Sequence, residues 1–182
     1  MAVTPRPYHH GNLRAALLES AEQTLNEGGE LSLRELARQV GVSHAAPRRH
    51  FAGKQALLDA LAEDGFERLG DDLRSALAAA APSFGARLLA FGRAYVRFAT
   101  EHAALLDLMF TGKHASPELN AASERCFSPA MALFRSELTG MVAFATLHGI
   151  AALVNRGLLR AEDLEALVDE AVEQMATRSV GG

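Results

Sequence analysis

The chain has 182 residues, of which 49% are hydrophobic and 22% are charged. This length allows one compact domain or two smaller ones, and the composition argues against a chain that is disordered throughout. The single cysteine, Cys126, excludes an intrachain disulfide framework and a multi-cysteine zinc site. Because the chain is rich in alanine and leucine and has no tryptophan, we expect an all-α fold.

The net charge is −4, but positive charge is concentrated in residues 31–54, which hold five lysine and arginine residues against one glutamate. Such a local excess is typical of nucleic-acid binding. The sequence has no apolar signal core near residue 1, and its longest apolar stretch, 141–154, is too short to span a bilayer. We therefore expect a cytoplasmic protein with no membrane partner. Phosphate-binding loops, nucleophile motifs and metal-ligand spacings are also missing from the sequence, so we expect neither an enzyme nor a metal or cofactor.

Two helices are predicted before residue 42. The first follows a possible cap at Asn12, has leucine and alanine at four-residue spacing, and ends at the glycines 28–29. The second begins with Ser32 and Glu35, whose spacing predicts a capping box, and ends at Gly41 after about two turns.

A third helix is predicted from Ser43, with Pro47 in its first turn. Two short helices joined by a three-residue turn form a helix-turn-helix in outline, although any three-helix bundle can show the same caps. The third helix would expose small residues that allow close approach to a major groove and arginines that can donate two hydrogen bonds to guanine or phosphate. This face holds His44, Ala45, Arg48, Arg49 and His50.

The stretch LSLRELARQVGVSHAAPRRHFAGKQALLDAL resembles the DNA-binding domain of the TetR family of transcription regulators. The matching positions are Ser32, Gly41, Val42, Ser43, His50, Phe51 and Lys54. One position departs from the family pattern, because Arg48 stands where the family usually has a tyrosine that contacts the DNA backbone. An arginine can still reach a phosphate, but with a different contact geometry.

The resemblance implies that Ser32, His50 and Lys54 contact phosphates. The alternative for His50 is a residue that packs on Phe51 at the end of the helix. Near the start of the sequence, Arg6, Tyr8, His9 and His10 are expected to belong either to an arm along the duplex or to a mobile end. The candidate base contacts are Arg34, His44, Ala45 and Arg49, and the full set of candidate DNA-binding residues is Ser32, Arg34, Ser43, His44, Ala45, Arg48, Arg49, His50 and Lys54.

The remainder of the chain predicts a helical body. A helix of about 24 residues starts at Lys54, and Gly65 and Gly70 within it indicate a bend or a close helix contact. Later helices carry an aromatic stripe at 84–98, apolar residues at 105–110 before a break at Gly112, and a cap at Ser116 with Pro117 at the first position.

Aromatic and methionine side chains of these helices either fill an ordinary core or line a cavity for an apolar or aromatic effector, which is what the family resemblance implies. The candidate ligand-binding residues are Phe84, Leu88, Phe91, Tyr95, Phe98, Met109, Phe110, Phe127, Met131 and Phe134.

The last two predicted helices, 141–157 and 161–178, have the apolar faces needed to form a four-helix bundle with a second copy. FATLHGIAALVNRGLL resembles the C-terminal domain of a TetR branch with a W-H-G-type signature, with Phe144 near the tryptophan position, and we expect His148 to be an interior or interface histidine. The abrupt passage from Gly140 into Met141 indicates either a shortened helix end or a missing segment.

We therefore predict a DNA-binding domain in residues 1–54, comprising the arm and a three-helix helix-turn-helix, and a ligand-binding and dimerisation domain in residues 55–182. The predicted function is that of a ligand-responsive repressor, which binds a palindromic double-stranded DNA operator as a homodimer through its last two helices. The alternative is a helical dimer that binds a small molecule but no DNA.

Overall fold

The computed structural model of the protein describes residues 13–111 and 116–180, with side chains described as far as Thr177. Within these ranges every regular element is helical, which confirms the predicted all-α fold. The chain divides into two compact units, residues 1–61 and 62–182. The predicted arm, the Asn12 cap and the break at Gly112 lie outside the described residues.

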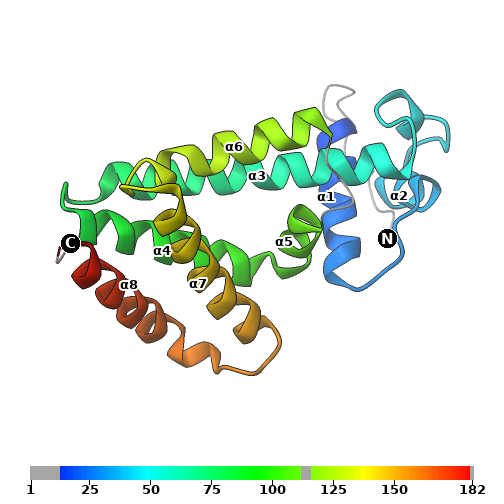
Figure 1. The fold of residues 1–182 in the computed structure, drawn as a ribbon. Helices are drawn as coiled ribbons and strands as arrows, with labels where there is room; N and C mark the ends of the chain where they lie inside the picture. Colours follow the sequence, from blue (N-terminus) through cyan, green and yellow to red (C-terminus); the bar gives the residue numbers. More distant parts are fainter. Residues whose placement is uncertain (1–12, 112–115, 181–182) are drawn as a thin grey trace. The chain divides into compact units, whose positions relative to one another are not determined.

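The first unit packs short helices around a small leucine-rich core. The leucine and alanine face of α1 packs against α2, and both contact the 3₁₀ helix η2 (Figure 1). Its regular elements are α1 (Leu13–Asn26), α2 (Leu33–Val40), η2 (Pro47–Arg49) and the start of α3 (Lys54–Ala79). The core side chains Leu17, Leu36, Phe51, Leu57 and Leu61 are at most 2% exposed.

The helix α3 belongs to both units, since it starts at Lys54 and continues without interruption to Ala79. The two units separate between Leu61 and Ala62, two turns into this helix. The domain boundary predicted after Lys54 therefore falls at the start of α3.

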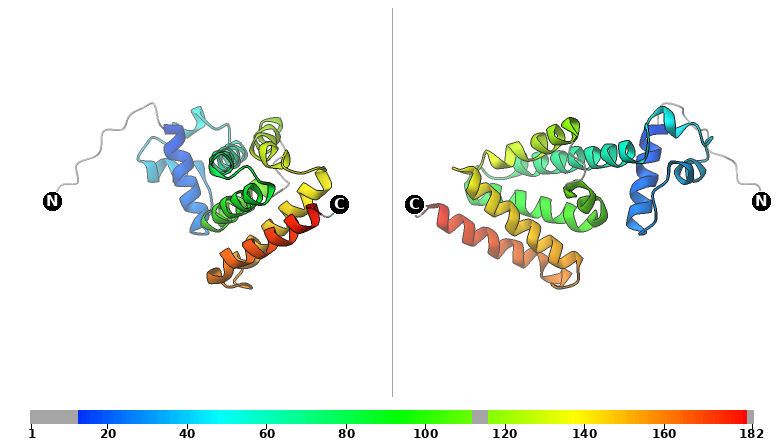
Figure 2. Two further views of the ribbon diagram at one scale, coloured as in Figure 1. Left: turned by 90° about the vertical axis from the view of Figure 1, so that its left-hand side faces the viewer. Right: turned by 45° about the vertical axis from the view of Figure 1, so that its right-hand side comes forward.

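In the second unit α4 packs against both α7 and α8, which also pack against each other (Figure 2). A close approach at Gly92 makes this possible, because a Cβ atom there would lie 3.2 Å from Leu147 and from Val168. The helices of this unit that follow α3 are α4 (Phe84–Glu101), α5 (Ala103–Phe110), α6 (Pro117–Met131), α7 (Glu137–Asn155), the 3₁₀ helix η3 (Ala161–Asp163) and α8 (Leu164–Val180).

The glycines within α3, Gly65 and Gly70, were predicted to mark either a bend or a close helix contact. Both lie at close helix contacts. A Cβ atom on Gly65 would lie 2.7 Å from the Met109 sulfur of α5. A Cβ atom on Gly70 would lie 3.3 Å from the Cα atom of Cys126, where α6 runs beside α3 (Figure 1). The predicted cap of α6 is confirmed, since Ser116 Oγ accepts a hydrogen bond of 3.1 Å from the Leu119 amide.

The predicted start of the penultimate helix at Met141 is wrong. The helix α7 begins at Glu137, because Ser136 Oγ accepts a hydrogen bond from the Thr139 amide and caps the first turn. It passes unbroken through Gly140, so the chain needs no additional segment there. With 19 residues, α7 is longer than the predicted apolar stretch 141–154, and it is long and apolar enough to cross a bilayer by length and composition alone. In the unit it packs against α4 and α8.

Candidate nucleic-acid interface

A glycine cap ends α2 and turns the chain toward the basic segment. Gly41 has a φ of +78°, the left-handed conformation that side chains disfavour. Its amide donates to the Arg38 carbonyl at 3.2 Å, and the Val42 amide donates to the Ala37 carbonyl at 2.9 Å. These hydrogen bonds satisfy carbonyls at the end of the helix and fix the direction in which residues 43–50 leave it.

The substitution Gly41→Ala should lower the free energy of unfolding by about 1 to 2 kcal/mol, because alanine must adopt a left-handed φ in the folded protein. Urea unfolding of the full chain measures this loss. The variant Gly41→Asn is the matched control and should lose less than Gly41→Ala, because asparagine tolerates the left-handed region better. Equal stability of Gly41→Ala and the parent chain would show that the cap does not need glycine.

The predicted third helix is not an α-helix. Residues 44–45 form a turn, Ala46 lies in a bend, and Pro47–Arg49 form a single 3₁₀ turn. Counted from Ser43 as the cap, Pro47 is the fourth helical residue, whose amide would donate the first hydrogen bond of an α-helix. Proline has no such amide, and the Ala46 amide instead donates to the Ser43 carbonyl at 2.9 Å. Pro47 therefore makes the recognition segment, residues 43–50, shorter and tighter than predicted.

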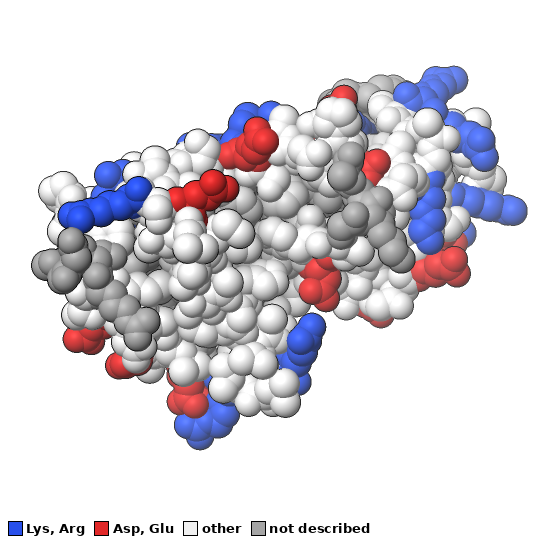
Figure 3. All heavy atoms as spheres, viewed as in Figure 1, with Lys and Arg blue, Asp and Glu red and all other residues white. Residues whose placement is uncertain are grey.

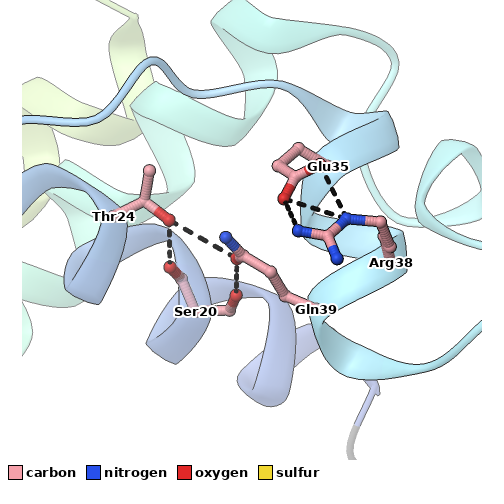
Figure 4. A network of polar contacts seen from close by, with 5 residues as sticks. All are labelled: Ser20, Thr24, Glu35, Arg38 and Gln39. Carbon is pink, nitrogen blue, oxygen red and sulfur yellow. Dashed lines mark hydrogen bonds and ion pairs between the residues drawn. The ribbon is translucent and has the colours of Figure 1, made fainter.

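The predicted capping box at the start of α2 is also wrong. Ser32 has the extended backbone of a cap, but its side chain makes no capping hydrogen bond. Glu35 instead accepts hydrogen bonds from Arg38, one turn further along (Figure 4). The hydrogen bond from Arg38 lowers the pKa of Glu35 and pairs one positive charge of the basic segment. The Ser32 hydroxyl and the first amides of α2 consequently remain available to an anion.

A polar contact that the sequence did not predict joins α1 to α2. Ser20 Oγ donates to Gln39 Oε1 at 2.6 Å, and Thr24 Oγ1 donates to the Ser20 carbonyl at 2.8 Å (Figure 4). Thr24 is 8% exposed, so this hydrogen bond satisfies a buried hydroxyl. The contact holds the end of α2 against α1, next to the Gly41 turn.

All nine candidate DNA-binding residues are exposed. Within residues 13–111 and 116–177, the guanidinium groups of Arg34, Arg48 and Arg49 have no acidic partner. Lys54 Nζ lies 3.9 Å from Glu30 Oε1, and both side chains are more than half exposed, so this ion pair is weak. Figure 3 shows several lysine and arginine side chains projecting from the unit that contains α2.

The two interpretations of His50 are not mutually exclusive. Its ring centroid lies 6.4 Å from that of the buried Phe51, at an interplanar angle of 54°. The His50 side chain is nevertheless exposed, so it contacts Phe51 along one side and leaves the other to solvent.

Six of the ten candidate ligand-binding residues form two groups of ring contacts in the second unit. Phe84 and Phe134 contact each other, with ring centroids 5.9 Å apart. Tyr95, Phe110 and Phe127 belong to a larger cluster in contact with one another through their rings. Phe91 touches this cluster through the Tyr95 ring, at a centroid distance of 6.2 Å. The remaining candidates are Leu88, Phe98 and Met109, which are buried, and Met131, which is half-buried.

Three members of this larger cluster were missed as ligand candidates at the level of sequence, namely Phe66, Phe144 and His148. They lie on α3 and α7. The spacing of residues within these two helices does not show that they contact the aromatic rings of the other helices. Within the cluster Tyr95 Oη lies 2.7 Å from His148 Nδ1, within hydrogen-bond distance. Burial raises the pKa of the Tyr95 hydroxyl, which keeps it protonated.

Reactive chemistry is not evident in the described residues. Burial raises the pKa of the Cys126 thiol to about 12, so it stays protonated and unreactive near neutral pH. Within residues 13–111 and 116–177, no group of three or more histidine, cysteine, aspartate and glutamate side chains is placed to hold a metal ion.

Comparison with known proteins identifies two family profiles along the chain. Residues 17–61 match the profile described as Bacterial regulatory proteins, tetR family, and residues 88–175 match the one described as Tetracyclin repressor-like, C-terminal domain. The HTH-type transcriptional regulator BetI of Cronobacter sakazakii is 31% identical over 159 residues, which cover 81% of this chain and 78% of that protein.

Two further similarities differ in how much of the chain they cover. The class C tetracycline repressor protein of Escherichia coli is 41% identical over 88 residues, 43% of this chain and 40% of that protein. A solved structure of a protein with unknown function from Rhodococcus sp. RHA1 is 40% identical, covers 96% of this chain and 98% of its own, and has a TM-score of 0.85.

Proposed function

Because the chain belongs to the TetR family of transcription regulators, we propose that it is a cytoplasmic repressor that binds a palindromic operator as a homodimer and releases it on binding a small effector. The observation that carries this proposal is the set of three exposed arginines on α2 and the recognition segment, which have no acidic partner among the described residues. Guanidinium groups of this kind bind phosphates and guanine without first breaking an ion pair.

The proposed division of labour at the DNA follows the chemistry of each side chain. Ser32 and the amides at the start of α2, together with His50 and Lys54, would bind phosphates. Arg34, Arg49 and the small residues before Pro47 would contact base edges. Arg48 would bind a phosphate in place of the tyrosine that the family usually has at this position.

An exposed apolar stripe on α7 supports the proposed dimer. Leu138, Met141 and Val142 are 72%, 57% and 55% exposed, and Leu153, further along the helix, is 38% exposed. Contiguous exposed apolar side chains of this size are typical of protein interfaces. Two copies joined through α7 and α8 would bring two recognition segments to successive major grooves, about 34 Å apart.

Gel-shift titrations of the full chain on an operator and on random duplexes, at several salt concentrations, test the proposed roles. Arg49→Ala should reduce the preference for the operator, because it removes a base contact worth about 1 to 3 kcal/mol. Lys54→Ala should weaken binding to all duplexes alike and flatten the salt dependence. If the parent chain binds the operator no better than random DNA, the proposed function is wrong; equal losses from both variants would contradict the separate roles.

A further inference from the structure

The second unit contains a cluster of six rings from five helices, α3 to α7, in which each ring contacts at least two of the others; Phe91 touches the cluster through Tyr95 alone. Neighbouring ring centroids lie between 5.2 and 6.3 Å apart. None of the six residues is an aspartate, glutamate, lysine or arginine. We call this the ring cluster, and its members are Phe66, Tyr95, Phe110, Phe127, Phe144 and His148.

The ring cluster reaches the surface of the unit at α5. Phe110, the last residue of α5, is 36% exposed, and its ring meets that of His148 edge-on at a centroid distance of 5.3 Å. Phe127, Phe144 and His148 are half-buried, whereas Tyr95 is fully buried. Phe110 therefore gives the ring cluster an edge that is open to solvent.

The hydrogen bond between Tyr95 and His148 determines which nitrogen of His148 carries a proton. Tyr95 is fully buried, and its hydroxyl proton has only His148 Nδ1 as an acceptor among the described residues. A buried donor left without an acceptor is costly, so the hydroxyl donates and Nδ1 accepts. A neutral imidazole that accepts at Nδ1 carries its proton at Nε2.

We propose that the Nε2–H group of His148 anchors the effector, and that the effector is a flat aromatic molecule carrying a carbonyl or hydroxyl oxygen. Among residues 13–111 and 116–177, nothing accepts a hydrogen bond from His148 Nε2. Tyr95, Phe110 and Phe144 contact the His148 ring and supply stacking surface beside it, and a donor next to these rings selects a ligand with an acceptor oxygen. A carboxylate would find no counter-ion within the ring cluster. This inference rests on the proposed effector response of the same unit.

Calorimetry of the full chain with two probes of nearly equal shape tests the anchor. The probes are 2-acetylnaphthalene, which has a carbonyl oxygen, and 2-isopropylnaphthalene, which has none. The parent chain should bind the ketone about five- to tenfold more tightly, as expected for one hydrogen bond. His148→Phe should abolish this preference while keeping a ring in place, and Tyr95→Phe should reduce it, because the proton on His148 is then no longer fixed. Glu124→Gln, at an exposed position of α6 outside the ring cluster, should leave the preference unchanged.

Nitrogen NMR of the parent chain gives a second measurement that does not depend on a variant folding. The His148 Nε2 signal should show a protonated nitrogen and should shift with the ketone but not with the hydrocarbon. Equal affinity for both probes, failure of the ketone to bind, or an unmoved His148 signal would overturn the anchor. Operator binding without any probe, measured by gel shift on the same variants, should be unchanged. A failure of that assay in the parent chain would instead count against the proposed function.

Discussion

A chain carrying both Met141→Glu and Val142→Glu should be monomeric and should bind its operator at least a hundredfold more weakly than the parent. These two positions lie in the exposed apolar stripe of α7, which we propose as the dimer contact. Two glutamates from each copy would bring four like charges into one apolar interface, where desolvation and repulsion both oppose association. A monomer presents one recognition segment at a time and forgoes the gain from simultaneous binding to two half-sites.

Analytical ultracentrifugation measures the oligomeric state of this variant, and circular dichroism checks that it remains helical. The matched control carries Ser75→Glu and Ala78→Glu, which add the same charge at exposed positions of α3. The control should remain dimeric and bind DNA nearly as tightly as the parent. A folded α7 variant that sediments as a dimer would show that the chain associates through another surface.

Replacing Arg34, Arg48 and Arg49 together by alanine should lower operator affinity by a factor of about a thousand or more. Removal of each side chain that binds a phosphate should flatten the slope of log affinity against log salt by about one. The three side chains are exposed and have no acidic partner in the described residues, so their removal should leave the fold intact.

The comparison for the arginine variant is a second triple substitution, Arg97→Ala, Arg125→Ala and Arg135→Ala, at exposed positions of the second unit. It makes the same change in net charge, so a general electrostatic effect on DNA binding would appear in both variants. Fluorescence anisotropy with a labelled duplex should show a large decrease in affinity only in the first. Similar decreases in both would mean that total charge, rather than the basic segment, determines affinity.

The sequence predicted the helical class and most helix positions correctly because apolar spacing and end signals are local. Gly41 ends α2 as predicted, and Ser116 caps α6 as expected. Gly140 misled the prediction, because a glycine inside a helix looks like a break. In the folded protein the Met131 side chain packs against Gly140, because a Cβ atom on this glycine would lie 2.9 Å from the Met131 sulfur.

Competition between neighbouring groups explains the errors around the recognition segment. Ser32 and Glu35 have the spacing of a capping box, but Arg38 offers Glu35 a charged partner on the exposed face of the same helix. Pro47 lies one position too far into the predicted helix for its missing amide to be harmless. Both outcomes depend on which of two local interactions is stronger, and spacing alone does not show this.

The contact between Tyr95 and His148 in the second unit could not be predicted from the sequence for a different reason. Tyr95 and His148 are 53 residues apart and lie on different helices, so only the packing of α4 against α7 brings them together. The residue pattern indicated an interior or interface position for His148, with no partner. The residue spacing predicted the aromatic stripe of α4, but it did not indicate that His148 is the hydrogen-bond partner of Tyr95.

Selection of bound fragments from a random DNA pool tests the central claim most directly, namely that two symmetry-related basic segments read one operator. We predict enrichment of a palindromic site whose half-site centres lie about 10 base pairs, or a multiple of one helical turn, apart. Enrichment of a single unpaired half-site, or no enrichment over the starting pool, would contradict it.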